Sequence, residues 1–461
     1  MTDLAKPRPH IGFAVRRAEL QRRADVNYAR WQPTVDDWKA RTRYELVPLK
    51  RLVSLVQYGD SSRSVEEDTG TPVLRMSNLQ DGDWDLSELK YTTLDGEARR
   101  PYLLREGDIL FNRTNSKELV GKCAVFRETG PWAFAGYLIR VRLSNSDAMS
   151  PDFTARFLNS GVGRVQIDQV SRQIIGMANI NAEELGGLLI PKPPEEVQAQ
   201  MVADLGAHWE NYQERLAHVR ELLSRGDREI AARLRLRVPV PERGRFWGAR
   251  RATQRNEDRL NAEFFNPERM LAVATIEGGP TPARRLDEAA EFVRDQVAAP
   301  PAGVRYIGLA NIERGTGELV RGLEEESPEG ACVRFKPGDV LFAKLRPYLN
   351  KVHLAEESGV CSPEFLVLRA AEGIRPEYLA AILRSEVTVA QTRHMAGGNT
   401  HPRLTATDVH AMRIPVPRES KVQDEIADAE AAHRASARAL KAQAEQDWKG
   451  AKQRFGDDLL G

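Results

Sequence analysis

The sequence predicts an α+β protein, in which two copies of one mixed α/β domain are separated by two long helices packed as an antiparallel coiled coil. Three observations predict this fold: an ordered internal repeat, a run of short strands in each copy, and one narrow apolar seam after each copy. With 461 residues the chain is long enough for two to four domains.

The internal repeat has a period of about half the chain. The matching segments are, in order, LRMSNLQDG with IGLANIERG, REGDILFNR with KPGDVLFAK, GKCAVF with NKVHLA, and LLIPKPPEEVQAQM with MRIPVPRESKVQDEI. The offset falls only from 233 for Asn78 and Asn311 to 225 for Gln198 and Gln423. One Gly-Asp before an apolar run is merely a turn that enters a buried strand. Four landmarks in the same order indicate two copies of one domain.

Each copy is expected to begin with short strands, because segments with alternating apolar residues are separated by the turn residues Gly, Pro, Asn and Asp. A short helix follows (DFTARFLNS and PEYLAAILRS), then a polar loop and a strand that ends in Pro-x-Pro. Cys123, Cys332 and Cys361 lie in apolar, strand-like contexts and are interpreted as small core residues rather than ligands. Their odd number indicates a reducing compartment.

A long helix follows each copy. Its apolar seam in copy one runs through Val197, Met201, Leu205, Trp209, Tyr212, Leu216, Val219 and Leu223. In copy two it runs through Val422, Ile426, Ala429, His433, Ala437, Leu440, Ala444, Trp448, Ala451 and Phe455. A narrow seam with steps of three and four residues favours a coiled-coil partner, and the alternative is two independent surface helices. A helix over 195–233 would be about 57 Å long.

The predicted boundaries follow from these patterns. They are an N-terminal helical extension (1–43), a first domain (44–194), a long spacer helix (195–236), a Pro-, Arg- and Gly-rich crossover linker (237–258), a second domain (259–417) and a second long spacer helix (418–461). Within the extension, AVRRAELQRRADVNYARW is an amphipathic, basic helix candidate. It either caps the helical pair or touches DNA, and the cap is the favoured interpretation.

The composition and the missing motifs exclude several classes of function. Lys and Arg number 67 against 66 Asp and Glu, a net charge of +1, which excludes a globally basic nucleic-acid coat but not local basic faces. The sequence has no Walker A loop, Gly-rich dinucleotide fingerprint, HExxH, CxxC or GxSxG motif. We therefore expect no catalytic residues, no metal site and no cofactor in this chain. Without a spanning apolar run or a signal peptide, we expect it in the cytoplasm.

The ordered motifs resemble those of the specificity (S) subunit of type I restriction–modification enzymes. Copy one carries YGDSS, GTPVLRMSNLQDGDWDLSELKY, REGDILFNRTNSKELVGKCAVF and IPKPPEEVQAQ, and copy two carries RLNAEFFNPE, YIGLANI, KPGDVLFAKLRPYLNKV and IPVPRESKVQDEI. The resemblance covers nearly all of residues 44–455. Family members usually carry an acidic residue followed by Gln where each long helix begins. Here Val197-Gln198 and Val422-Gln423 stand at these places, with the acids displaced to Glu195, Glu196 and Glu419. This departure could alter contacts to partner subunits.

The resemblance implies that each copy is a target recognition domain reading one half of a bipartite, asymmetric site in double-stranded DNA. Two adenine methyltransferase (modification) subunits would dock on the chain, joined by ATP-dependent translocase and nuclease (restriction) subunits. S-adenosylmethionine, ATP and Mg²⁺ would then be bound by those partners, and the chain itself would be non-catalytic. Two alternatives remain: an enzyme carrying its own recognition domains, and a coiled-coil scaffold with no DNA role.

Candidate DNA-contacting residues are basic, amide and hydroxyl side chains in polar loops, because Arg suits guanine, Asn and Gln suit adenine, and all of them suit phosphates. In copy one they are Tyr58, Ser61, Ser62, Arg113, Thr114, Asn115, Lys117, Arg172 and Gln173. In copy two they are Lys344, Arg346, Tyr348, Asn350, Lys351, Arg393, His394, Asn399, Thr400 and Arg403. Ordinary solvated turns are the alternative for each loop. Asn78 and Asn311 are expected to cap turns, and Trp84 and Trp132 to be core or flank residues.

Overall fold

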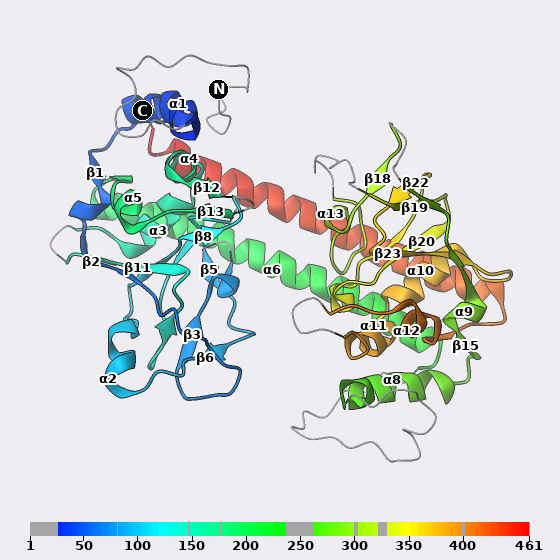
Figure 1. Cartoon of the computed structure of the whole chain (residues 1–461). Coiled ribbons are helices and arrows are strands. Elements are labelled where there is room, and N and C mark those ends of the chain that lie inside the picture. The colour runs from blue at the N-terminus through cyan, green and yellow to red at the C-terminus, as the bar shows by residue number, and fades with distance from the viewer. Residues whose placement is uncertain are drawn as a thin grey trace. The chain divides into compact units, whose positions relative to one another are not determined.

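The computed structural model describes residues 26–80, 82–117, 119–145, 148–174, 177–236, 262–298, 303–320, 330–397 and 402–460. The chain divides into two compact units (Figure 1). Unit 1 comprises Met1–Glu214 and Gln443–Gly461, and unit 2 comprises Arg215–Ala442. Each unit therefore contains one part of each long helix.

Unit 1 is built on a four-stranded antiparallel sheet. Its order is β2 (Val53–Tyr58), β11 (Leu138–Leu143), β7 (Ile109–Asn112) and β9 (Cys123–Val125). The smaller sheets are β10 (Ala133–Phe134), β3 (Pro72–Leu74) and β6 (Lys90–Tyr91); β12 (Arg172–Ile174), β13 (Met177–Asn179) and β8 (Thr114–Asn115); β1 (Leu46–Pro48) with β14 (Leu189–Pro191); and β4 (Leu79–Gln80) with β5 (Asp83–Trp84). Its helices are α1 (Val26–Arg41), α2 (Gly96–Arg99), α3 (Pro151–Asn159), α4 (Gly161–Val170) and α5 (Ala182–Gly186).

Unit 2 has the same main sheet. Its order is β16 (Ala290–Val293), β23 (Phe365–Ala370), β20 (Asp339–Ala343) and β21 (Val352–Leu354). The remaining strands are β17 (Gln296–Val297), β19 (Cys332–Phe335), β22 (Gly359–Cys361) and β18 (Tyr306–Ile307) in one sheet, and β15 (Ala283–Arg285) with β24 (Arg413–Pro415). Its helices are α8 (Pro267–Glu277), α9 (Leu286–Ala289), α10 (Pro376–Arg384), α11 (Glu386–Arg393) and α12 (Ala406–His410).

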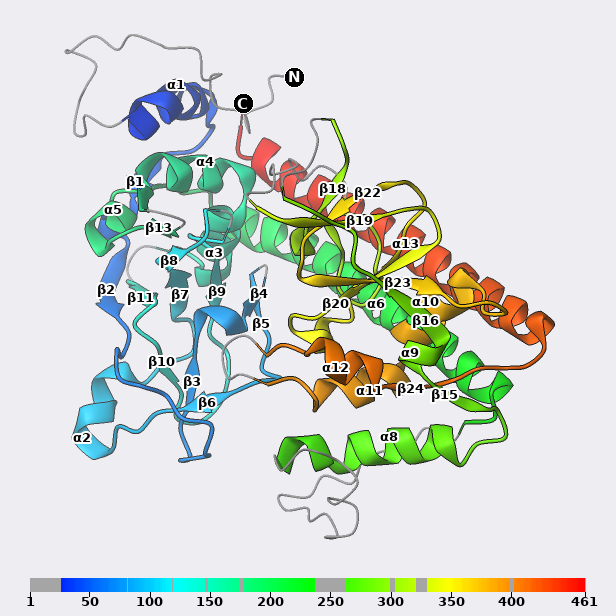
Figure 2. The same cartoon turned by 45° about the vertical axis from the view of Figure 1, so that its right-hand side comes forward.

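The shared topology is what the internal repeat predicts. In each unit the strand that follows the Gly-Asp turn, β7 or β20, lies between a long antiparallel neighbour and a short one. A parallel strand pair accompanies each main sheet, β3 with β10 and β18 with β22. Figure 2 shows the two sheets with the helices that follow them in the chain. The structure thus has the mixed helix and sheet fold that the sequence predicts.

The long helices are α6 (Glu195–Arg233) and α13 (Ser420–Asp457), very close to the predicted spans. In unit 1 the ring of Trp209 lies 5.0 Å from that of Trp448, centroid to centroid. In unit 2 Glu229 and Arg233 of α6 contact His433 and Glu425 of α13, at 3.0 and 2.6 Å. Later residues of α6 thus contact earlier residues of α13, so the two helices are antiparallel within each unit. That they form a coiled-coil spacer between the domains stays a prediction.

The seam residues of both helices enter the domain cores. In unit 1, Met201 and Leu205 of α6 and Phe455 of α13 join the core beneath α3 and α4. In unit 2, Ile230 of α6 and Ile426 of α13 join the core around α10 and α11. The alternative of two helices lying independently on their own domains is therefore wrong, because each unit buries parts of both helices.

Several details differ from the sequence prediction or lie beyond it. A second helix, α4 or α11, follows the predicted short helix in each copy. The predicted N-terminal helix lies mostly outside the described residues, and α1 begins at Val26 and packs against α4. The Arg43 N–H and the Thr42 hydroxyl both donate to the Leu459 carbonyl at 3.1 Å, and the cap interpretation of the extension stays a prediction. The predicted crossover linker lies outside the described residues.

The three cysteines are buried and free, which confirms their interpretation as core residues. Burial raises the pKa of the Cys123 thiol to about 12. Among the described residues, no helix is long and apolar enough to cross a membrane.

Candidate nucleic-acid interface

A buried ion pair fixes the strand that leads to the candidate loops in each unit. Asp108 and Asp339, the aspartates of the two Gly-Asp turns, are fully buried. Nε and Nη2 of Arg142 donate to Asp108 at 2.7 and 2.8 Å, and the same atoms of Arg369 donate to Asp339 at 2.9 and 3.0 Å. These two-bond pairs couple β7 to β11 and β20 to β23, so the ends of β7 and β20 are held at equivalent places.

The structure brings two predicted loops of copy one together at one edge. Directly after β7, residues Thr114 and Asn115 form β8. Thr114 pairs with Asn179, which also pairs with Arg172. Most of the segment 171–179, predicted as a polar loop, therefore consists of the antiparallel strands β12 and β13. We call Tyr58, Arg113–Asn115, Arg172–Ile174 and Met177–Asn179 edge 1.

Edge 1 combines basic and exposed apolar side chains. The Arg113 guanidinium lies 4.9 Å from the centre of the Tyr58 ring, and the Tyr58 hydroxyl accepts the Ala182 N–H at 2.9 Å. Tyr58 is 41% exposed, Tyr137 53% and Met177 48%. The Arg113 N–H donates to the Tyr137 carbonyl at 3.0 Å, so Tyr137 belongs to the same edge. The sequence reasoning did not select Tyr137 or Met177, although an aromatic residue at the start of a strand was a usable signal.

Other candidates of copy one have partners within the unit. Thr114 is buried, and its hydroxyl accepts the Asn179 amide at 2.6 Å. The Arg172 guanidinium donates to Glu184 at 2.8 Å in an exposed pair. Ser62 bonds to Asp60 through its backbone and its hydroxyl. Lys117 and Ser61 are exposed.

Asn115 bonds locally, because its side-chain oxygen accepts the Ser116 N–H at 2.8 Å. Gln173 pairs through its backbone with Ala178, and its side chain lies outside the described residues.

Unit 2 has an equivalent edge. Directly after β20, the Lys344 N–H donates to the Glu364 carbonyl at 2.9 Å, as Arg113 does to Tyr137. Leu345 forms a bridge with Arg403, as Thr114 pairs with Asn179. The Arg403 guanidinium donates to the Glu364 carboxylate at 2.8 Å. We call Lys344–Arg346, Tyr348, Glu364 and Arg403 edge 2.

Edge 2 contains one exposed ring, and the two candidates that follow it in the chain face inward. Tyr348 is 47% exposed. Asn350 adopts a left-handed backbone, with φ 48°, and its amide donates to the Arg384 carbonyl at 2.7 Å. The Lys351 ammonium donates to the Leu309 carbonyl at 2.7 Å, and burial lowers the pKa of Lys351. Asn350 and Lys351 therefore have structural partners inside the unit.

The sequence predicted that Arg393 and His394 lie in a polar loop between strands, and this prediction is wrong. Arg393 is the last residue of α11, and both side chains bind Glu268 of α8, with His394 Nε2 at 2.7 Å from the carboxylate. Asn399 and Thr400 lie outside the described residues.

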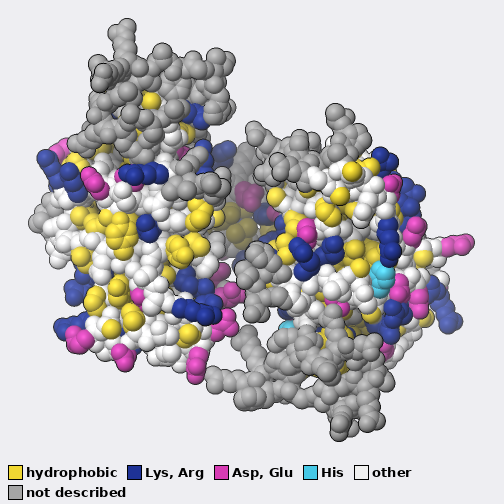
Figure 3. Space-filling model, in the orientation of Figure 1, with side chains coloured by type: hydrophobic (Ala, Val, Ile, Leu, Met, Phe, Trp, Pro, Cys, Tyr) yellow, Lys and Arg dark blue, Asp and Glu magenta, His cyan; other side chains and the backbone are white. Residues whose placement is uncertain are grey.

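The two edges suit binding of a polyanion with base-edge contacts, because basic groups stand beside exposed rings in both edges and beside amides in edge 1. Figure 3 shows dark blue basic and yellow hydrophobic side chains interspersed on the visible face of each unit. Within the part of the chain that the structure describes, no group of three His, Cys, Asp or Glu residues could hold a metal ion. Nothing tests the individual DNA contacts, which remain predictions.

The residues assigned to turns and core behave as predicted. The Asn78 side chain accepts the Arg75 N–H and donates to the carbonyls of Asp85 and Glu88, and Asn311 accepts the Gly308 N–H at 2.7 Å. Trp84 and Trp132 are partly buried and pack against a small core cluster.

Gln198 and Gln423 point into their own domains rather than toward a partner surface. Gln198 accepts the Ser150 N–H at 2.9 Å and donates to the carbonyls of Ala148 and Pro193. Gln423 makes the same three bonds, to the Arg375 N–H and the carbonyls of Gly373 and Pro417. Both side chains are buried and serve their own domains. The expected effect of the displaced acidic residues on contacts to partner subunits stays a prediction.

Comparison with known proteins gives two curated relatives. The putative type I restriction enzyme MjaX specificity subunit of Methanocaldococcus jannaschii is 25% identical over 167 residues, which is 36% of this chain and 38% of that protein. The type I restriction enzyme EcoKI specificity subunit of Escherichia coli K12 is 25% identical over 162 residues, 34% of each protein. The match therefore spans little more than a third of these relatives. No protein-family model matches the chain.

Solved structures that are similar to the chain include two S subunits. The type I restriction–modification S subunit of M. genitalium covers 91% of this chain and 96% of its own, with 12% identity and a TM-score of 0.40. The similarity to the HsdS subunit of Thermoanaerobacter tengcongensis covers 90% of this chain and 96% of that subunit, with 16% identity and a TM-score of 0.33. The family resemblance expected from the motifs is confirmed, since both curated relatives are type I specificity subunits.

Proposed function

We propose that this chain is the DNA sequence-specificity subunit of a type I restriction–modification complex and has no catalysis of its own. The observation that carries the proposal is the equivalence of edges 1 and 2. Each copy of the repeat places a basic residue, Arg113 or Lys344, directly after the same buried strand and beside the same returning segment. Two similar readers in one chain suit a site with two halves.

The two halves of the proposed site differ, because the edges differ in chemistry. Edge 1 presents two tyrosine rings with Arg113, whereas edge 2 presents a carboxylate, Glu364, bound to Arg403. Carboxylates accept from the amino group of cytosine, and guanidinium groups donate to guanine. The chain would therefore read an asymmetric sequence in duplex DNA.

The proposed partners are two adenine methyltransferase subunits and ATP-dependent restriction subunits. In this proposal S-adenosylmethionine, ATP and Mg²⁺ are bound by those partners. The proposal gives the long helices α6 and α13 the role of setting the distance between the two half-sites. Half-sites one helical turn apart are about 34 Å apart, and a 39-residue helix is longer than that, at about 57 Å.

The test is a map of N6-methyladenine across the host genome, with and without the gene for this chain. We expect a bipartite motif that loses methylation in the deletion strain and regains it with the gene restored. An unchanged methylation map would contradict the proposal. Methyl transfer or DNA cleavage by the rigorously purified chain alone would contradict its non-catalytic role.

A domain exchange tests the division of labour. Replacing residues 44–190 with the equivalent domain of another such subunit should change one half of the methylated motif and leave the other half unchanged. If both halves change together, the two copies do not read independently. The reciprocal exchange of residues 259–417 is the matched control.

A further inference from the structure

A cavity in unit 1 has a one-sided charge. It has a volume of about 140 Å³ and lies where the α3–α4 junction meets α6 and α13. Its basic lining residues are Lys122, Arg156, Arg164 and Lys452, and no Asp or Glu lines it. A cavity lined by several cations and no carboxylate is expected to attract an anion.

The four basic side chains differ in the partners that they have within unit 1. The Arg164 guanidinium bonds to Asp168 and to two backbone carbonyls, and the Lys452 ammonium lies 5.2 Å from the centre of the Trp448 ring. Arg156 is partly buried, and no carboxylate among the described residues lies within ion-pair distance of it. The two aspartates that act electrostatically on Arg156 have other partners, since Asp152 binds Arg127 and Asp83 accepts the Trp209 indole N–H.

Burial lowers the pKa of Arg156, and the more distant Asp152 and Asp83 offset only part of this effect. A bound anion beside Arg156 would therefore stabilise the charged form of its guanidinium group.

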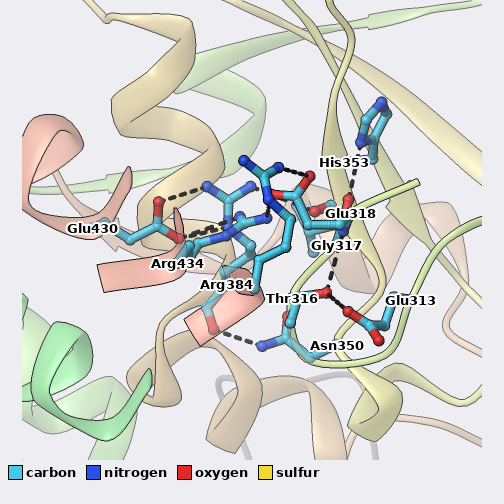
Figure 4. Close-up of polar contacts among 11 residues, drawn as sticks. Glu313, Thr316, Gly317, Glu318, Asn350, His353, Arg384, Glu430 and Arg434 are labelled. Carbon is cyan, nitrogen blue, oxygen red and sulfur yellow. Dashed lines mark hydrogen bonds and ion pairs between the residues drawn. The ribbon is translucent and has the colours of Figure 1, made fainter. Parts of the chain in front are cut away.

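The other copy of the repeat fills the equivalent place with its own carboxylates. The equivalent cavity in unit 2, at an offset of 225 residues, is about 50 Å³ and is lined by Asp227 and Glu430. Asp227 takes the place of Lys452 and accepts the backbone N–H of Glu386, the first residue of α11, at 3.1 Å. Glu430 takes the place of Leu205 and binds Arg384 at 2.8 and 2.9 Å (Figure 4).

The two equivalent cavities therefore differ in charge. In unit 2 Glu430 binds both Arg384 and Arg434, and Figure 4 shows these ion pairs between α10 and α13. In unit 1 Lys452 and Leu205 occupy the positions of Asp227 and Glu430, and Asn159 and Trp209 occupy those of Arg384 and Arg434, so the cations of this cavity come from other positions. The cavity of unit 2 is thus lined by carboxylates as well as cations, and the cavity of unit 1 by cations without a carboxylate.

We propose that the cavity of unit 1 binds a phosphate-type oxyanion, with Arg156 and Lys452 as its principal ligands. This site is separate from edges 1 and 2 and lies where the first domain meets the helices. Bound oxyanion would tie α3 and α4 to α13, the role that Asp227 and Glu430 fulfil in unit 2. The small cavity suits inorganic phosphate better than a nucleotide.

The test is a calorimetric titration of the full chain with inorganic phosphate at constant ionic strength, against sodium chloride. We expect saturable binding of one phosphate and a rise in the melting temperature of about 3 °C at ten times the half-saturating concentration. Adenosine monophosphate is the second arm, and we expect it to bind more weakly. No binding above that of chloride would overturn the proposal.

Two variants and one control locate the site. Arg156→Gln should weaken phosphate binding at least tenfold, and Lys452→Asp, which copies unit 2, should abolish the dependence of the melting temperature on phosphate. Lys449→Gln removes an exposed charge of α13 outside the cavity and should bind as the wild type does. Wild-type affinity in both cavity variants would overturn the assignment. If a variant does not fold, the wild-type titration still decides whether one phosphate binds.

Discussion

At the scale of single residues, the buried aspartates show what the sequence could and could not predict. The Gly-Asp pairs predicted a turn before a buried strand, and the structure has that turn. The sequence did not predict that Asp108 and Asp339 bind arginines about 30 residues later, because these partners meet only through the register of neighbouring strands.

Asp339→Asn should destabilise unit 2. The change removes the negative charge and one of the two oxygens that accept from Arg369, and we expect a loss of about 2–3 kcal/mol, reduced because the arginine is partly exposed. Urea unfolding measures the loss. Glu291→Gln, which alters an exposed and longer contact of the same arginine, should change stability little. Equal effects of both changes would contradict the role given to Asp339.

Asp227 should make unit 2 less stable as pH rises. Burial, helped by nearby Glu386 and Glu430, raises the pKa of Asp227 from 3.8 to about 7. The folded state therefore favours the protonated form, and the stability this contributes is present below about pH 4 and is lost as pH rises through 7.

Asp227→Asn removes this titration while keeping an acceptor for the Glu386 N–H. Its stability relative to the wild type should increase by about 2 kcal/mol between pH 5 and pH 8. Thermal unfolding at both pH values tests this. Asp428→Asn, at an exposed position of α13, is the control and should show no such trend. A pH-independent difference for Asp227→Asn would show that the carboxyl does not titrate in this range.

At the scale of elements, the long helices were the most predictable part of the fold and α4 and α11 the least. A seam repeated over ten turns is a local signal that survives in the sequence alone. The ten residues of α4 include two glycines and two glutamines, and its position is set by packing against α1 and α3. Tertiary context, not local propensity, makes this segment helical.

The start of each long helix depends on one buried glutamine. Gln198→Ala would leave the Ser150 N–H and two carbonyls without their partner, and we expect a loss of about 2 kcal/mol in the free energy of unfolding. Gln200→Ala changes an exposed glutamine of the same turn and should have little effect. If both variants lose the same stability, the effect comes from helix propensity instead.

At the scale of the whole molecule, the repeat predicted which loops would be equivalent, but not which residues would share an edge. Arg113 and Arg172 were selected separately, and only the pairing of β8 with β13 brings their segments together. Tyr137 and Glu364 were missed because they contribute backbone carbonyls from strand ends that the sequence did not mark as loops.

Lengthening both long helices tests the proposed spacer. Four residues inserted after Glu214 in α6 and after Ala442 in α13 add about 6 Å to each helix, at the boundary between the units. DNA rises about 3.4 Å per base pair, so the methylated motif should gain one or two base pairs between unchanged half-sites. Four residues inserted within 237–258 should leave the motif unchanged. An active double insertion that keeps the original motif would contradict the spacer role.

The composition of unit 1 has a consequence for the order in which the chain can fold during synthesis. Its core needs Trp448 and Phe455 against Met201 and Leu205, yet all of unit 2 is translated between them. At 5–20 residues per second, the ribosome takes about 10–50 s to cross that interval. The residues of unit 2 are contiguous and emerge together, whereas the apolar face of α6 in unit 1 has to wait. The second copy of the repeat can therefore complete its fold before the first.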